Sequence, residues 1–170
     1  ICNHEIEQPL HGPVGPFGAK GERLDKIAKE ALFDAGPLAM GGTTTLIYDT
    51  QTKRVEREFL SLAGTSRNCA GGPTPWNSWL TCEETVARAG DGGAGGLLKD
   101  HGWVFEVPST SESVVLNPQP LKAMGRFNHE AVCVDPRTGI VYLTEDREDG
   151  LIYRFLPKTR GRLAEGGRLQ

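Results

Sequence analysis

A short apolar strand that ends in metal-binding residue types occurs three times in this sequence. The clearest copies are WLTCEE at residues 79–84 and IVYLTEDR at residues 140–147, and the opening residues 1–5, ICNHE, look like the end of a third copy. Aligning Thr81 with Thr144 gives an offset of 144 − 81 = 63 residues, and the flanking segments match in the same order. Units of four short antiparallel strands repeated along a chain are typical of β-propeller blades. The sequence therefore predicts an all-β fold that forms part of a β-propeller.

The repeat divides the chain into about two to two and a half four-stranded blades within one partial propeller domain. Residues 1–62 are expected to form the end of one blade with an insertion, residues 63–118 a complete blade, and residues 119–170 an incomplete one. A propeller needs at least four blades to close. We therefore expect this chain, which begins in mid-fold, to be a fragment. The alternative is a small β-meander or sandwich in which the repeat is accidental.

Glycine and proline shape the expected connections between strands. The 22 glycines and 11 prolines favour turns and loops over long helices. One short amphipathic helix is expected in the insertion near residues 22–33, where apolar residues recur at helical spacing. The glycine run at residues 90–96 is interpreted as a flexible connection, because it lacks the strand-to-helix context of a nucleotide-binding loop.

Composition excludes several classes of protein. The net charge is −3 and the sequence has no block of like charges, which argues against nucleic acid as a partner. No stretch approaches the roughly 18 apolar residues that a membrane span requires. The four cysteines form no CxxC pair, so neither a zinc ribbon nor a redox motif is supported.

Antiparallel pairing predicts where the polar strand ends meet. The start of a blade's first strand lies beside the end of its second strand. Residues 128–130 should therefore lie beside residues 145–146, and residues 67–68 beside residues 82–83. In a propeller these positions share one rim of the central channel. The carboxylates expected there are Glu5, Glu83, Glu84, Glu130, Glu145 and Asp146. Like charges this close either take up protons or bind cations, so the sequence predicts a metal site.

The ligand types point to more than one metal. Carboxylate oxygens in this number favour Ca²⁺, whereas the Cys82 thiolate and the His129 imidazole favour iron or zinc. The competing interpretation of each acid is a solvated strand end, and that of Cys82 is a buried structural thiol. Cys133 is expected to serve packing. Cys69, His11 and His101 carry no comparable context.

The longest motifs resemble a known enzyme family. They are NHE at 3–5, GGTTTL at 41–46, AGTSRNCAGGPTPWNSWLTCEE at 63–84, HGWVFEV at 101–107 and LKAMGRFNHEAVCVDPRTGIVYLTED at 121–146. These motifs resemble those of the PhoX-type alkaline phosphatases and their uncharacterised relatives. The resemblance implies a β-propeller that hydrolyses phosphate monoesters with a mixed iron and calcium cofactor. It also implies export through the twin-arginine route, and hence a periplasmic or secreted protein, although this chain contains no signal peptide.

The resemblance also implies roles for individual residues. Cys82 would be the thiolate that binds iron. Its companions among the iron and calcium ligands would be Glu83, Glu130, Glu145 and Asp146, with Asn3 and Glu5 in the same cluster.

The function expected for the full-length protein is that of a monomeric, metal-dependent phosphomonoesterase with a small phosphorylated substrate. Arg67 and Arg126, each just before a ligand-bearing strand, are candidates to clamp the phosphate. Asn68 and Asn128 are candidates for substrate binding. The alternatives are a binding propeller whose blades are stapled by calcium, and a calcium-dependent, lactonase-like hydrolase. As an incomplete propeller, the isolated chain is expected to be inactive.

Overall fold

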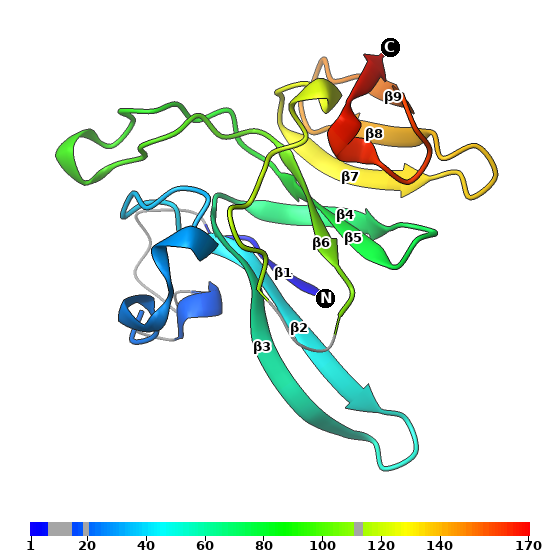
Figure 1. Cartoon of the computed structure of the whole chain (residues 1–170). Coiled ribbons are helices and arrows are strands. Elements are labelled where there is room, and N and C mark those ends of the chain that lie inside the picture. Colours follow the sequence, from blue (N-terminus) through cyan, green and yellow to red (C-terminus); the bar gives the residue numbers. More distant parts are fainter. Residues whose placement is uncertain (7–14, 19–20, 111–113) are drawn as a thin grey trace.

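The chain folds into three antiparallel sheets, as seen in a computed structural model that describes residues 1–6, 15–18, 21–110 and 114–170 (Figure 1). The sheets follow one another along the sequence, and within each sheet every strand pairs with the next strand in the chain. The first sheet contains β1 (Cys2–His4), β2 (Gly41–Asp49) and β3 (Arg54–Thr65). The second sheet contains β4 (Asn68–Pro73), β5 (Ser78–Glu83) and β6 (Val104–Pro108). The third sheet contains β7 (His129–Val134), β8 (Val141–Glu145), β9 (Ile152–Pro157) and β10 (Gly167–Leu169). This all-β arrangement confirms the predicted fold class of a partial propeller.

Apolar side chains fill the spaces between successive sheets. Leu80 and Val104 of the second sheet pack with Val132, Leu143 and Phe155 of the third sheet in one buried cluster. A second buried cluster joins the first and second sheets through Leu62, Phe105 and Val107. Because successive side chains of a strand point to opposite faces, β5 and β6 can serve both neighbours at once. The sheets therefore stack face to face, as propeller blades do.

The helical elements are six short 3-10 helices in the described part of the chain. They are η1 (Gly15–Phe17), η2 (Leu24–Lys26), η3 (Lys29–Ala31), η4 (Gly93–Gly95), η5 (Lys122–Met124) and η6 (Leu163–Glu165). The helix expected near residues 22–33 is thus present only as the two separate turns η2 and η3. Extended backbone at Ile27 and Ala28 separates them, and Leu32 then bridges to Ala63 of β3. Pairing with β3 pulls the segment out of helical geometry.

The division of strands among the blades differs in detail from the expectation. The second unit, residues 63–118, was expected to be a complete four-stranded blade, and its described residues form three strands. The third unit, residues 119–170, was expected to be incomplete, and it forms four strands, of which β10 is the last. β3 continues to Thr65, three residues beyond the predicted end of the first unit.

No helix among the described residues is both long and apolar enough to cross a membrane.

Candidate metal centre

The predicted meeting of strand ends occurs in two of the sheets. Asn68 of β4 pairs with Glu83 of β5, and His129 of β7 pairs with Glu145 of β8. Main-chain bonds extend both pairings past the strands. The Glu84 amide donates to the Arg67 carbonyl at 2.9 Å, and the Asp146 amide donates to the Asn128 carbonyl at 3.0 Å. Antiparallel register thus delivers the acids that follow β5 and β8 to one place.

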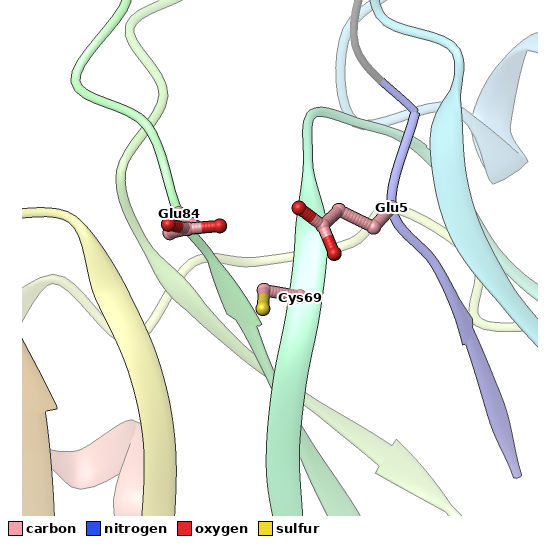
Figure 2. Close-up of side chains that lie close together, drawn as sticks. All are labelled: Glu5, Cys69 and Glu84. Atoms are coloured by element: carbon pink, nitrogen blue, oxygen red, sulfur yellow. The ribbon is translucent and has the colours of Figure 1, made fainter. Parts of the chain in front are cut away.

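Five of the residues at these strand ends form a group that we call the acidic cluster: Glu5, Cys69, Glu84, Glu130 and Asp146. One donor atom each from Glu5, Cys69 and Glu84 lies within 4.8 Å of the others, and the same holds for Glu84, Glu130 and Asp146. Figure 2 shows the first three side chains, from three separate segments, directed toward one another. Glu84 belongs to both groups and therefore joins them.

Crowding of negative charge shifts the proton equilibria inside the cluster. Burial, a hydrogen bond shared with Asp146, and the charges of Glu130 and Glu5 raise the pKa of Glu84 to about 7, although Arg67 opposes this shift. The Cys69 thiol donates to Oε1 of Glu130 at 3.4 Å. Burial, this bond and the surrounding carboxylates raise the pKa of Cys69 to about 12. At neutral pH the cluster therefore retains protons that a bound cation would displace.

Arg67 brings the positive charge to this site. Its Nη2 atom lies 3.3 Å from a Glu84 oxygen and 3.8 Å from a Glu5 oxygen. The residue has φ = 45°, a left-handed conformation that is uncommon for a side chain of this size. Its buried Nε has no hydrogen-bond partner among the described residues. The guanidinium therefore has a free donor at the border of the acidic cluster.

Glu83, which was predicted as a ligand, is committed to another task. Its carboxylate is fully buried and accepts bonds from the main-chain amides of Ser66, Gly102 and Trp103 at 2.8–3.0 Å. It also bonds Nδ1 of His101 at 2.7 Å, and Nε2 of the same ring bonds Asp34 at 3.1 Å. Both Glu83 oxygens are occupied by protein groups. Glu83 is therefore part of a buried Asp34–His101–Glu83 triad that holds loops together, and it is not a member of the acidic cluster.

The two predicted asparagines that begin the repeat units also have structural partners. The Asn3 amide donates to the carbonyls of Cys69 and Ala70, and its oxygen accepts bonds from the side chains of Trp79 and Thr81. Asn68 is buried and bonds the hydroxyls of Thr65 and Thr81. Asn3 therefore ties the first sheet to the second. Both amides have protein partners on nitrogen and on oxygen in this structure.

Three further predicted ligands are not members of the acidic cluster. Cys82 is fully buried in the apolar core between the second and third sheets, where burial raises the pKa of its thiol. The His129 ring is fully buried and lies tilted by 32° against Phe127 at a centroid distance of 3.6 Å, and burial lowers its pKa to about 4. Glu145 accepts a hydrogen bond from the Tyr153 hydroxyl at 2.9 Å. Their surroundings fit packing and internal hydrogen bonding.

The remaining two predicted residues, Arg126 and Asn128, differ in whether their side-chain polar atoms have hydrogen-bond partners. Arg126 donates from Nη2 to the carbonyls of Val86 and Ala87 at 2.7 and 2.9 Å, so it fastens the loop after β5. The buried Oδ1 atom of Asn128 has no partner among the described residues. Asn128 precedes β7 next to Asp146, and its free oxygen is a further acceptor near the cluster.

Cys69 is the cluster member that sequence reasoning missed. The pairing rule that placed residues 67–68 beside residues 82–83 reaches Cys69 if it is extended by one position. Its place in β4 corresponds to that of Glu130 in β7, since both lie near the start of a first strand. The signal was therefore present in the repeat.

Two comparisons with known proteins found similarities to this chain. The family described as "Alkaline phosphatase PhoX" matches residues 19–170. A solved structure titled "Pseudomonas fluorescens PhoX in complex with vanadate, a transition state analogue" aligns with 22% sequence identity and a TM-score of 0.48, over 75% of this chain. The chain covers 31% of that structure's length. No curated protein matches the chain significantly.

Proposed function

Because this chain belongs to the PhoX family of alkaline phosphatases, we propose that the protein containing it hydrolyses phosphate monoesters at the acidic cluster, with iron and calcium as cofactors. The observation that carries the proposal is the convergence of four carboxylates and a thiol from five strand ends, with Arg67 at their border. Carboxylates and a thiol this close together favour bound cations, which compensate their negative charge. An arginine held beside bound cations by its ion pairs with Glu84 and Glu5 suits a phosphate.

The donor set fits metal ions in both spacing and chemistry. Oxygen ligands lie about 2.3–2.6 Å from Ca²⁺, so two ligands on opposite sides of one ion are at most about 5 Å apart. The donor atoms in each group lie within 4.8 Å of one another. The thiol of Cys69 would suit iron and the carboxylates would suit calcium, and Glu84, which belongs to both groups, could be a ligand in either. Such ions would act as Lewis acids on the phosphoryl oxygens.

The protein's own groups would bind and orient the substrate. In this proposal Arg67 directs two N–H donors at a phosphate, a contact that is stronger than a neutral hydrogen bond. Its ion pairs with Glu84 and Glu5 hold the guanidinium at the cluster before substrate arrives. Burial of Glu84 and Cys69 lowers the local dielectric, and this strengthens each of these interactions.

Two other functions are weighed against this one. A propeller stapled by calcium alone would use carboxylates and would have no need of a thiol, whereas Cys69 lies within the cluster. A lactonase-like enzyme would act on cyclic esters and would have no need of a cation such as Arg67. Elemental analysis separates the first alternative, since calcium without a transition metal would favour it. Hydrolysis of a lactone in the absence of phosphatase activity would favour the second.

Turnover of an aryl phosphate by the whole protein, loaded with calcium and iron, tests the proposal. We expect hydrolysis, and we expect Arg67→Met to lower kcat/KM by about a hundredfold because a charged phosphate contact is lost. Arg137→Met is the matched control, since the Arg137 side chain is 92% exposed at a turn of the third sheet. Absence of turnover in protein shown to contain both metals would overturn the proposal. Export to the periplasm or medium, expected from the resemblance, is tested by cell fractionation.

A further inference from the structure

A β-bulge in β4 presents Cys69 to the acidic cluster. The register of β4 against β5 shifts between residues 68 and 71, so that Cys69 and Ala70 together face one residue, Cys82. A bulge bends its strand and redirects a side chain, and bulges are common beside functional sites. Glu130 occupies the equivalent bulge of β7, and its Oε1 atom accepts the Cys69 thiol at 3.4 Å. Two members of the cluster thus come from matching bulges in neighbouring sheets.

The Asn3 side chain holds this bulge from the first sheet. Its Nδ2 atom donates to the carbonyl oxygens of the two bulged residues, Cys69 at 3.1 Å and Ala70 at 2.8 Å. Its Oδ1 atom accepts from Nε1 of Trp79 at 3.1 Å and from the Thr81 hydroxyl at 2.9 Å. Because an indole N–H can only donate, the amide oxygen has to face Trp79 and the nitrogen has to face the bulge. The two donors and two lone pairs of the amide are all used, and this fixes its orientation.

Asn3 is also linked to the position of Glu5. Asn3 lies in β1, which ends at His4, and Glu5 follows directly. One carboxylate oxygen of Glu5 lies within 4.8 Å of donor atoms of Cys69 and Glu84. Figure 2 shows Glu5 and Cys69 on neighbouring segments of the chain, with their side chains directed toward each other. The Asn3 amide therefore joins the segment that carries Glu5 to the segment that carries Cys69.

We propose that Asn3 is a positioning residue of the metal centre, which holds the bulge at Cys69 and so sets how the Cys69 thiolate and the Glu5 carboxylate meet one ion. The inference rests on the proposed function, because it takes the acidic cluster to bind metal. Groups that orient metal ligands commonly change metal affinity by about 10–100-fold when they are replaced. The same range is expected for Asn3.

A role as a simple staple between two sheets makes a different prediction. A staple would lower the free energy of unfolding and would weaken both ligand groups of the cluster alike. A positioning role is selective, because the group that contains Cys69 spans the first and second sheets, which Asn3 joins. The other group, Glu84, Glu130 and Asp146, comes from the second and third sheets. Loss of the Asn3 amide should therefore weaken the thiolate-bound ion more than an ion held by carboxylates alone.

Asn3→Asp in the whole protein tests this selectivity. The substitution keeps the side-chain volume and the oxygen that faces Trp79, but it places a second oxygen against the carbonyls of Cys69 and Ala70. After removal of metals, we expect iron affinity, followed by the iron–thiolate absorption band, to fall about 10–100-fold. Calcium affinity, measured by calorimetry, should not fall. The added negative charge would by itself strengthen cation binding, so a fall in iron affinity reports the loss of geometry.

Two further variants accompany this test. Trp79→Phe is milder, because it keeps both bonds to the bulge and removes one donor to the Asn3 oxygen. It should lower iron affinity by less than Asn3→Asp does. Thr43→Val is the matched control, since Thr43 pairs with Asn3 in the first sheet and its buried hydroxyl bonds Ser61 at 2.8 Å. It should lower stability in urea and leave iron affinity unchanged.

Alkylation of Cys69 in the metal-free protein reports on the bulge without metal or turnover. Cys69 is half-buried, and the exposed Cys133 is the internal reference. We expect Asn3→Asp to raise the alkylation rate of Cys69 relative to Cys133 about tenfold, and Thr43→Val to leave this ratio unchanged. Unchanged iron affinity and alkylation in Asn3→Asp, or equal losses of iron and calcium affinity, would overturn the inference. Absence of phosphatase activity would overturn the proposed function, and the alkylation ratio would still decide whether Asn3 positions Cys69.

Discussion

Replacing Asp34 by asparagine should cost this protein a large part of its stability. The Asp34 carboxylate is buried and accepts the amides of Gly36, Leu98 and Lys99 at 2.6–2.9 Å, in addition to Nε2 of His101 at 3.1 Å. An asparagine of the same shape keeps one acceptor oxygen and turns an NH₂ group toward donors. It also leaves His101 with a single carboxylate partner, Glu83.

The size of the effect follows from these contacts. Breaking a buried ion pair from one side costs about 3–5 kcal/mol, because the remaining charge and its unpaired donors stay buried. Domains of this size are stable by about 5–15 kcal/mol. We therefore expect Asp34→Asn to remove about 3–5 kcal/mol of unfolding free energy. The loss should loosen the loop at residues 85–101 first, since three of the four bonds to Asp34 come from it.

The pH dependence of the free energy of unfolding gives a second, independent test of the contacts between Asp34 and His101. Burial alone would lower the pKa of His101, but its bonds to Glu83 and Asp34 raise it above 6.5 overall. Burial alone would raise the pKa of Asp34. The hydrogen bonds from Gly36, His101, Lys99 and Leu98 outweigh burial and lower this pKa below 3.8 overall. The stabilisation by protonated His101 is complete below pH 6.5 and is lost as pH rises through its folded pKa. The stabilisation by ionised Asp34 is complete above pH 3.8 and is lost as the pH falls through its folded pKa.

Urea unfolding followed by tryptophan fluorescence measures both signatures. The difference between wild type and Asp34→Asn should be greatest between pH 3.8 and 6.5 and should narrow above pH 6.5. Asp49→Asn is the matched control, because Asp49 also accepts the amides of Gln51 and Thr52 but is exposed at a hairpin turn. We expect it to cost less than about 1 kcal/mol. An equal loss in both variants, or a difference independent of pH, would refute the role assigned to the triad.

Two further predictions concern the acidic cluster. Glu84→Gln should stabilise the metal-free protein above pH 7 by about 2–3 kcal/mol, because the raised pKa of Glu84 makes its ionisation unfavourable there, and it should weaken calcium binding. Denaturant titration at pH 5 and pH 8 measures the stability, and calorimetry measures calcium binding. A loss of stability at pH 8 would contradict the prediction. Cys69→Ser should abolish the absorption band of a bound iron–thiolate, because Cys69 lies in the acidic cluster. Cys82→Ser should leave the band and lower stability instead, because Cys82 lies in the core. Loss of the band in the Cys82 variant alone would reverse the assignment.

The sequence alone determined the strand pattern and the neighbourhood of the site. The repeated apolar runs that end in acids at 79–84 and 140–147 predicted β5 and β8 to within a residue or two, because a short apolar run is a local feature of the sequence. Antiparallel pairing then predicted which strand ends meet, and the register confirms it at Asn68 and His129. The helix near residues 22–33 failed because a distant strand, β3, captures that segment.

Only the tertiary structure decided which of the strand-end residues face one another. Glu83 and Glu84 are adjacent and chemically alike, yet they point to opposite sides: one is fixed by His101 and three amides, and the other joins the acidic cluster. Likewise, Cys82 enters the core while Cys69 meets the carboxylates. Asp34 finds His101 across 67 residues of sequence. No local pattern encodes these choices, because they depend on how sheets stack and on which loop returns to pair with each buried charge.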